Sequence, residues 1–509
     1  MPATTHLDSA LDDFLTGLSD DALELHGMLI VRGDAVIAEV EATPRSLADS
    51  RLVYSVSKTV TMLALATAID DGLIGLDDIA VDVLGIANAD PDAARLTVRH
   101  LARMSSGHSS ESLGPMEELA VRERIPLVDA WFRLPLDTEP GSTFSYDSGA
   151  TYVLGALVRH VTGESLADRA RTRVLAPIGI GEFAWFRAAG DDEGFSGLHL
   201  TISDMARIGM LLRDGGVSRG RRIVSAELVA ELTRSQIDNG EPDSPDWSAG
   251  YGLQLWRSRH GFRADGAYGQ FVLVLPQQDV VIAITSEQTE GTTKALLERV
   301  WQHLLPVIED PVERTVTRTI ELPEPRSGDE LANDIDVSGG SNTDPASRAY
   351  TPVSHTGTGA LWTGFSPARL PLTALRVDAD HDARRFTLTF ADNESATIAA
   401  GHGRWIAGAI GGLGGGDLPT DPTDRRGTVA VTAQATRTQR QLICDVVLPS
   451  TPHRFRIVVD PEAGTFDARW RGEPLYGADP RTLVTGAVRH AVGEASIPLP
   501  RIPREAPHL

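Results

Sequence analysis

Cysteine, lysine and long apolar runs are all scarce in this 509-residue chain. The single cysteine, Cys444, excludes an internal disulfide and a multi-cysteine zinc site, and its alternating apolar surroundings predict a buried thiol. The longest apolar stretches, such as Val280 to Ile284, are far shorter than the roughly 20 residues that cross a bilayer, so no transmembrane helix is expected. Met1 to Ser19 contains no Lys or Arg and no secretory apolar run, which predicts a cytoplasmic protein.

Positive charge is also limited. The chain has 47 Lys and Arg against 70 Asp and Glu, giving a net charge of −23. Nucleic acid and anionic membranes both need a basic face, so neither is an expected partner. Because no metal-ligand spacing such as H-E-x-x-H appears, we expect neither metal nor cofactor.

Only two of the 47 basic residues are lysines, Lys58 and Lys294, so the rest are arginines. Lys58 stands three positions after Ser55. An arginine stays protonated in proteins, whereas a buried lysine can lose its proton and act as a base. Ser-x-x-Lys is therefore the spacing of a serine nucleophile with its own amine base. The alternative is a serine at a helix start followed by a solvated lysine.

Apolar periodicity predicts a β-hairpin over 27–40 and a helix over 56–69 that Ser55 opens. Comparable patterns predict further helices over 98–104, 151–161, 203–213 and 292–305, and strands over 251–256, 269–275 and 280–285. Strands near both ends with helices between them indicate an antiparallel sheet flanked by a helical region, in a domain spanning residues 1–308.

Residues 309–352 include stretches rich in Gly, Ser and Pro and are interpreted as a linker. Segments of alternating polarity then predict an all-β domain over 353–509, a small sandwich or barrel of unknown role, with a proline-rich tail at its end. Gly216 to Gly220 satisfies G-x-S-x-G, but a predicted helix precedes it where a nucleophile elbow needs a strand. This segment is interpreted as a glycine turn.

Four ordered segments carry a family resemblance. They are Tyr54 to Lys58, Ser105 to His108, Tyr146-Asp147-Ser148 and Ala264 to Ala267. Together they resemble the penicillin-recognising serine hydrolases, in the branch related to class C β-lactamases, which also holds esterases, peptidases, amide hydrolases and acyltransferases. The resemblance covers about residues 25–305 and implies an α/β (α+β) fold of the β-lactamase and transpeptidase type.

The resemblance also implies roles for individual residues. Ser55 is expected to form an acyl-enzyme, with Lys58 as its neutral base partner. Tyr146 is expected to share proton transfer with Lys58 and to serve the leaving group. The backbone N–H groups of Ser55 and Ala267 match the two oxyanion-hole donors.

Two departures from the family pattern bear on the substrate. Ser148 stands where many relatives have an asparagine, and Ala264 stands where they have a lysine or histidine, so the cation expected to engage a substrate carboxylate is missing. Because penicillins and cell-wall peptides carry such a carboxylate, an intracellular esterase or amidase fits better.

Four residues are candidates for substrate binding: Ser148, Asp265, Gly266 and His108. Asp265 is predicted either to hold a substrate ammonium or to pair with Arg263. His108 is predicted either to line the pocket or to lie on the polar surface.

The sequence thus predicts a serine hydrolase that cleaves a small-molecule ester or amide through Ser55. Acyl transfer, D-amino-acid peptidase or β-lactamase action on the same scaffold remains open, as does a catalytically silent member that only binds ligands. The oligomeric state is also left open.

Overall fold

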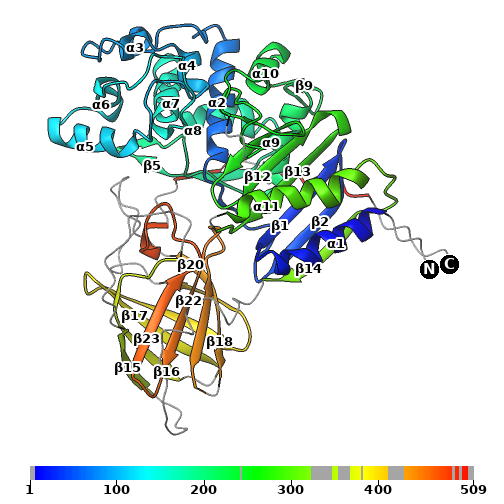
Figure 1. Cartoon of the computed structure of the whole chain (residues 1–509), viewed down its shortest axis with the longest axis vertical. Helices are drawn as coiled ribbons and strands as arrows, with labels where there is room; N and C mark the ends of the chain where they lie inside the picture. The colour runs from blue at the N-terminus through cyan, green and yellow to red at the C-terminus, as the bar shows by residue number, and fades with distance from the viewer. Residues whose placement is uncertain are drawn as a thin grey trace.

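The computed structural model describes residues 6–240, 244–289, 291–322, 347–353, 367–379, 382–410, 429–438, 440–483, 488–491 and 496–502. These residues form a domain of helices and sheet and, beneath it in Figure 1, a β-barrel. The helical region lies beside the sheet, and helix α2 (Val56–Asp70) stands between them. The predicted combination of a domain of helices and antiparallel sheet with an all-β domain is therefore confirmed.

The main sheet has seven strands in the order β10-β11-β12-β13-β1-β2-β14. All neighbouring pairs are antiparallel except β2 and β14, which are parallel. The predicted hairpin over 27–40 is confirmed with wider bounds. The strands are β1 (Leu25–Arg32), β2 (Ala35–Thr43), β10 (Trp256–Arg257), β11 (Phe262–Gly266), β12 (Gln270–Leu275), β13 (Val280–Ser286) and β14 (Val316–Glu321).

One predicted strand is much shorter than the sequence suggested. Of residues 251–256, only Trp256 enters a strand, because the chain turns at Gln254, whose φ is +59°. The Gln254 N–H donates to the Ala102 carbonyl at 2.9 Å. This segment therefore faces the helical region instead of extending the sheet.

Helices cover both faces of the main sheet. On one face, α1 (His6–Asp20) and α11 (Thr292–Arg299) share an apolar cluster with the sheet residues Met28, Ile30 and Ile282. On the other face, α9 (Ile202–Arg213) packs against β12 and β13. A Cβ built on Gly209 of α9 would lie 2.5 Å from the Val281 side chain, so a glycine is needed for this close approach.

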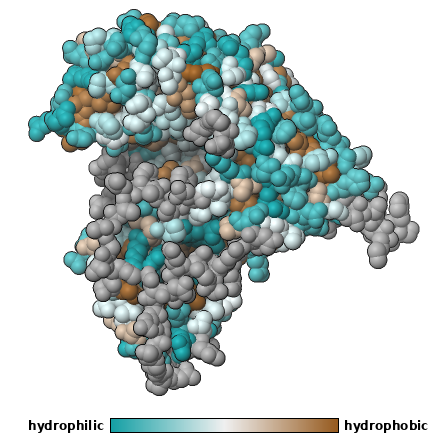
Figure 2. Space-filling view, in the orientation of Figure 1, coloured by the Kyte–Doolittle hydropathy of each residue, from teal (hydrophilic) through white to brown (hydrophobic). Residues whose placement is uncertain are grey.

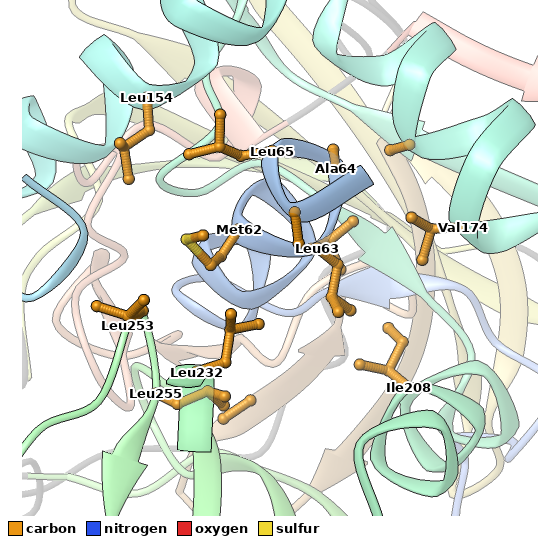
Figure 3. Close-up of a cluster of buried hydrophobic side chains, with 14 of the residues drawn as sticks. Met62, Leu63, Ala64, Leu65, Leu154, Val174, Ile208, Leu232, Leu253 and Leu255 are labelled. Carbon is orange, nitrogen blue, oxygen red and sulfur yellow. The ribbon is translucent and has the colours of Figure 1, made fainter. Parts of the chain in front are cut away.

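Helix α2 is buried on every side. All residues from Val56 to Ala68 are buried, as expected for a helix that is apolar all round. In Figure 3, Met62, Leu63 and Leu65 point outward from α2 in different directions, toward apolar side chains of the surrounding elements such as Leu154, Ile208 and Leu253. The predicted helix over 56–69 is confirmed, and it forms a rigid base for the residue that opens it.

The remaining α-helices and short strands complete the first domain. The helices are α3 (Ala80–Leu84), α4 (Val98–Ala102), α5 (Leu113–Glu123), α6 (Leu127–Arg133), α7 (Ser148–Thr162), α8 (Leu166–Ala170) and α10 (Ala226–Thr233). A small sheet of order β24-β4-β7-β3 joins β3 (Arg51–Leu52), β4 (Glu182–Trp185), β7 (His199–Leu200) and β24 (Val488–Ala491). Two hairpins pair β5 (Arg187–Ala188) with β6 (Asp191–Asp192), and β8 (Val217–Ser218) with β9 (Arg221–Arg222). The second hairpin agrees with a glycine turn at 216–220.

The second body is a nine-stranded sheet that closes on itself. Its order is β18-β17-β16-β15-β23-β22-β21-β20-β19, and a further pairing of β18 with β20 completes a barrel. Apolar residues on alternate positions, including Phe386, Leu388 and the buried Cys444, fill its interior. The strands are β15 (Ser347–Pro352), β16 (Leu372–Ala379), β17 (Ala383–Phe390), β18 (Ser395–His402), β19 (Ile406–Ile410), β20 (Val429–Arg437), β21 (Leu442–Val447), β22 (Arg454–Asp460) and β23 (Thr465–Trp470).

The range interpreted as a linker, 309–352, contains ordered strands at both ends. Its first part forms β14 in the main sheet, where Val316 is fully buried, and its last part forms β15 of the barrel. Residues 323–346 lie outside the described residues. The first domain therefore extends to at least Leu322, because parallel pairing with β2 recruits a short segment that has little apolar content of its own.

Chain beyond the barrel returns to the first domain. Strand β24 pairs with β4, and the Val36 N–H donates to the Pro500 carbonyl at 2.8 Å. Arg501 pairs with Glu39 at 2.8 Å. The segment expected to be a tail therefore contacts the first domain as far as Ile502. Residues 503–509 lie outside the described residues.

Hydrophilic residues dominate the face shown in Figure 2, and hydrophobic residues form small separate groups on it. Within the described ranges, no helix combines the length and apolar character needed to span a bilayer.

We predict that shortening a core side chain of α2 destabilises the first domain. Leu63→Ala should lower the free energy of unfolding by about 2 to 5 kcal/mol, because Leu63 is fully buried and leaves a cavity. Leu73→Ala is the matched control, since Leu73 is 48% exposed, and it should change stability by less than about 0.5 kcal/mol. Urea denaturation of both variants measures the difference, and equal losses would contradict the packing described for α2.

Candidate active site

Ser55 stands at the N-terminus of α2. The preceding Tyr54 has φ +48°, a left-handed conformation that turns the chain sharply between β3 and the helix. Ser55 is the N-cap residue, but its side chain does not cap the helix. Its partly exposed hydroxyl is therefore available for chemistry, at the helix end that favours developing negative charge on an oxygen.

The Lys58 amine lies in contact with this hydroxyl. Its Nζ is 3.0 Å from Ser55 Oγ, 3.1 Å from Ser148 Oγ and 3.0 Å from the Phe195 carbonyl oxygen. The side chain is 1% exposed. An ammonium can donate to all three oxygens, whereas a neutral amine donates to two of them and offers its lone pair to the third. The alternative of a solvated lysine is therefore wrong.

Burial lowers the pKa of Lys58 to about 8, because removal from water disfavours the charged amine. The carboxylates of Glu111, Asp147 and Glu193 act in the opposite direction and keep the pKa from falling further. Roughly a tenth of the amine is therefore neutral at pH 7, and the neutral amine is the form that a general base requires.

Tyr146 lies on the other side of the Lys58 amine, which is 4.9 Å from the centre of its ring. The ring stacks on Trp256 at 5.5 Å and meets the edge of Tyr251 at 6.3 Å. Burial raises the pKa of Tyr146 above its usual value, although a hydrogen bond with the Ser55 side chain opposes this shift. The hydroxyl thus stays protonated and can donate within reach of Ser55.

The end of β11 lies against the turn before Ser55. A Cβ on Gly266 would lie 2.3 Å from the Val53 carbonyl oxygen, so this position requires glycine. The rings of Tyr54 and Tyr268 are 5.2 Å apart, and Ala267 packs against the apolar cluster that contains both of these residues. Within the part of the chain that the structure describes, neither the Ser55 N–H nor the Ala267 N–H has a hydrogen-bond acceptor.

Three further sequence candidates have defined places. Ser148 contacts the Lys58 amine directly. Asp265 pairs with the Arg263 guanidinium at 2.9 Å, which is the alternative to ammonium binding that the sequence left open. His108 is 6% exposed, 3.4 Å from Asp147 and edge-on to Trp131. It is therefore not on the polar surface, and it supports the N-terminus of α7 through Asp147.

Sequence reasoning missed Glu111. Part of Glu111 is exposed, but its carboxylate lies against Ser148, whose hydroxyl binds Lys58, and accepts the Ser148 N–H at 3.0 Å. Partial removal of this carboxylate from water and the nearby Asp147 raise the pKa of Glu111. No motif marks this residue, since it comes from the loop before α5 and meets α7 only through tertiary folding.

One cluster among the described residues has the composition of a metal site. Ligand atoms of Glu24, His26 and Glu287 lie within 4.8 Å of one another. Glu24, however, pairs with Arg454 at 2.6 Å and with Arg471 at 3.0 Å. Two guanidinium groups already occupy this carboxylate, so the cluster is better suited to an ion-pair network than to a divalent cation.

Comparisons with known proteins identify a family for the first domain. Residues 27–305 match the family model described as Beta-lactamase. The chain is similar to penicillin-binding protein 4 of Amycolatopsis lactamdurans, with 27% identity over 326 residues, covering 56% of this chain and 82% of the relative. It is also similar to the 6-aminohexanoate-dimer hydrolase of Paenarthrobacter ureafaciens, with 25% identity over 291 residues, covering 52% and 73%.

A solved structure named "Putative 6-aminohexanoate-dimer hydrolase from Bacillus anthracis" shares the fold. Its TM-score is 0.50 at 21% identity, and the match covers 58% of this chain and 82% of that one.

We predict that Lys58 titrates near pH 8 and that Glu111 sets part of this value. Because the chain has two lysines, ε-¹³C-lysine NMR gives two signals, which Lys294→Arg assigns. Glu111→Gln should move the Lys58 midpoint to lower pH, since a carboxylate that stabilises the ammonium is lost. The matched control, Glu117→Gln on exposed α5 surface, should leave it in place. A Lys58 midpoint above pH 10 would contradict the burial argument.

Proposed function

Because the chain belongs to the beta-lactamase family over residues 27–305, we propose that it is a serine hydrolase that cleaves a small ester or amide through an acyl-enzyme on Ser55. The observation that carries this proposal is the buried Lys58 amine, 3.0 Å from Ser55 Oγ. A neutral amine in this position can take the hydroxyl proton as the oxygen attacks. The similarity to a protein named as a hydrolase supports the same conclusion.

The proposed reaction has two halves. In the first, Lys58 accepts the Ser55 proton, Oγ bonds to the substrate carbonyl carbon, and the oxyanion is bound by the N–H groups of Ser55 and Ala267. The bond to the leaving group then breaks, and Tyr146 supplies a proton to that group. Lys58 in turn gives its proton to Tyr146. In the second half, water attacks the acyl carbon and gives a proton to the same pair. The bond between Oγ and the acyl carbon then breaks, and the pair returns the proton to Oγ, which releases the acid and restores Ser55.

The charges around Lys58 bear on the substrate class. Three carboxylates, those of Glu111, Asp147 and Glu193, act on its amine. The position where many relatives have a cation is Ala264, which is 2% exposed. Its neighbour Arg263 is fully buried and committed to Asp265 and to acceptors on Asp246, Arg257 and Ser258. A substrate carboxylate would therefore face negative charge, which favours neutral substrates.

We predict covalent acylation at Ser55. A fluorophosphonate or p-nitrophenyl acyl ester should add the mass of one adduct to the intact protein, and Ser55→Ala should abolish it. Lys58→Arg should slow the reaction about thousandfold or more, because a guanidinium cannot accept the proton. Lys294→Arg is the matched control and should react at the wild-type rate. If no small ester acylates the wild type, the proposal fails in favour of a cleft that only binds ligands.

We also predict discrimination against acyl groups that carry a carboxylate. kcat/KM should be at least about tenfold lower for mono-p-nitrophenyl succinate than for p-nitrophenyl butyrate, a difference of about 1.4 kcal/mol. Glu111→Gln should reduce the ratio of kcat/KM for the butyrate ester to kcat/KM for the succinate ester, whereas Glu117→Gln should not. Using the ratio cancels any effect of Glu111 on the Lys58 pKa. An unchanged or inverted preference would show that the carboxylates do not select the substrate.

A further inference from the structure

A loop of the barrel, residues 448–453, is bound tightly to the chain just before the nucleophile. The Arg45 side chain, 1% exposed, donates to four carbonyl oxygens of this loop: Leu448 at 3.2 Å, Thr451 at 2.7 Å, Pro452 at 2.7 Å and His453 at 3.1 Å. The Leu52 N–H also donates to the Ser450 carbonyl at 2.9 Å. The barrel loop is thus fixed to β3, three residues before Ser55.

The end of this loop reaches Tyr54 itself. The Tyr54 hydroxyl is 2.6 Å from His453 Nε2, and His453 Nδ1 is 3.1 Å from Glu287 Oε1. Because the carboxylate oxygen accepts, Nδ1 carries the proton and Nε2 accepts from the tyrosine. All three side chains are buried. The hydrogen-bond chain therefore fixes the ring of the residue whose backbone adopts φ +48°.

A second part of the barrel domain, around residues 473–476, contacts the other segments of the site. The Tyr268 hydroxyl, one residue beyond Ala267, donates to the Glu473 carbonyl. Tyr476 stacks on Tyr54 at 6.1 Å, and its hydroxyl lies 2.6 Å from Glu193 and 2.9 Å from Ser196. Phe195 lies between these two residues and supplies the carbonyl that binds Lys58.

We propose that the barrel completes the active site and that His453 is a positioning residue for Ser55, acting through Tyr54. A non-glycine residue with positive φ persists only where its surroundings determine it. Tyr54 is held by His453 and Tyr476 of the barrel domain and by Tyr268 of the first domain. The turn that aims the Ser55 hydroxyl and its N–H is therefore held by residues almost 400 positions later in the chain. This inference rests on the proposed function.

The test separates positioning from binding and from folding. The variants are Tyr54→Phe, which removes only the hydroxyl, His453→Leu, the double variant, and His453→Gln, whose amide oxygen can replace Nε2 as acceptor. Acylation by a p-nitrophenyl ester is followed under single-turnover conditions. These measurements give the maximal rate and, separately, the ester concentration for half-maximal rate.

Tyr54→Phe and His453→Leu should each lower the maximal rate about 10- to 100-fold with little change in the half-maximal concentration, since a misplaced nucleophile slows chemistry more than binding. The double variant should be no slower than the worse single variant, because both remove one interaction. His453→Gln should recover most of the rate. His402→Leu, at an exposed barrel histidine, is the control and should match the wild type.

The outcomes distinguish this inference from the proposed function. Wild-type acylation with an unchanged maximal rate in Tyr54→Phe, or multiplicative losses in the double variant, would overturn the positioning role alone. A wild type that no ester acylates would overturn the proposed function and the positioning role with it. Tyr54→Phe keeps the ring and its packing. Its thermal unfolding shows whether the variant is still folded when its acylation rate is lower.

Discussion

The contact between the Lys58 amine and the Ser55 hydroxyl depends on the burial of α2 from Val56 to Ala68. A lysine on an exposed helix would keep its proton at neutral pH, and its long side chain would move freely. Here the helix is buried from Val56 to Ala68, so both residues project from a fixed backbone and their side chains meet. Burial then has two effects, because it lowers the pKa of the amine and limits it to three oxygen partners.

Those oxygen partners come from three separate parts of the chain, and each part is fixed by its own contacts. Ser148 opens α7, whose N-terminus Asp147 caps through the Gly149 N–H at 3.0 Å. The Phe195 segment is bound through Glu193 to Tyr476, beyond the barrel strands. The Ser55 turn is held between β11 and the barrel loop. A change in any one of these supports would therefore alter the geometry around the same amine.

The residues that the sequence could indicate are those with a local pattern. Ser55 and Lys58 share one helical turn, Tyr146 stands before a helix, and Gly266 stands at a strand end, so spacing and turn residues identify them. Glu111, the Phe195 carbonyl and His453 have no such pattern, because they reach the site only through tertiary packing.

The same reason explains the differences in the fold. The hairpin over 27–40 and the helix over 56–69 follow from periodicity within the segment. Strand β14 and strand β24 instead form by pairing with distant partners, β2 and β4, and residues 251–256 turn away from the sheet at Gln254. Closure of the barrel through β18 and β20 likewise depends on which strands meet, which alternation within each strand does not encode.

The near absence of lysine acquires a physical meaning when Lys58 is compared with the buried arginines. Burial lowers the pKa of Arg45 to about 9, which still leaves it a cation at neutral pH, and its guanidinium can hold four carbonyl oxygens at once. Burial brings Lys58 to about 8, close enough to neutrality for the proton to leave. Arginine therefore serves where a permanent charge fixes the barrel loop, and Lys58 stands where the proposed reaction needs a proton to move.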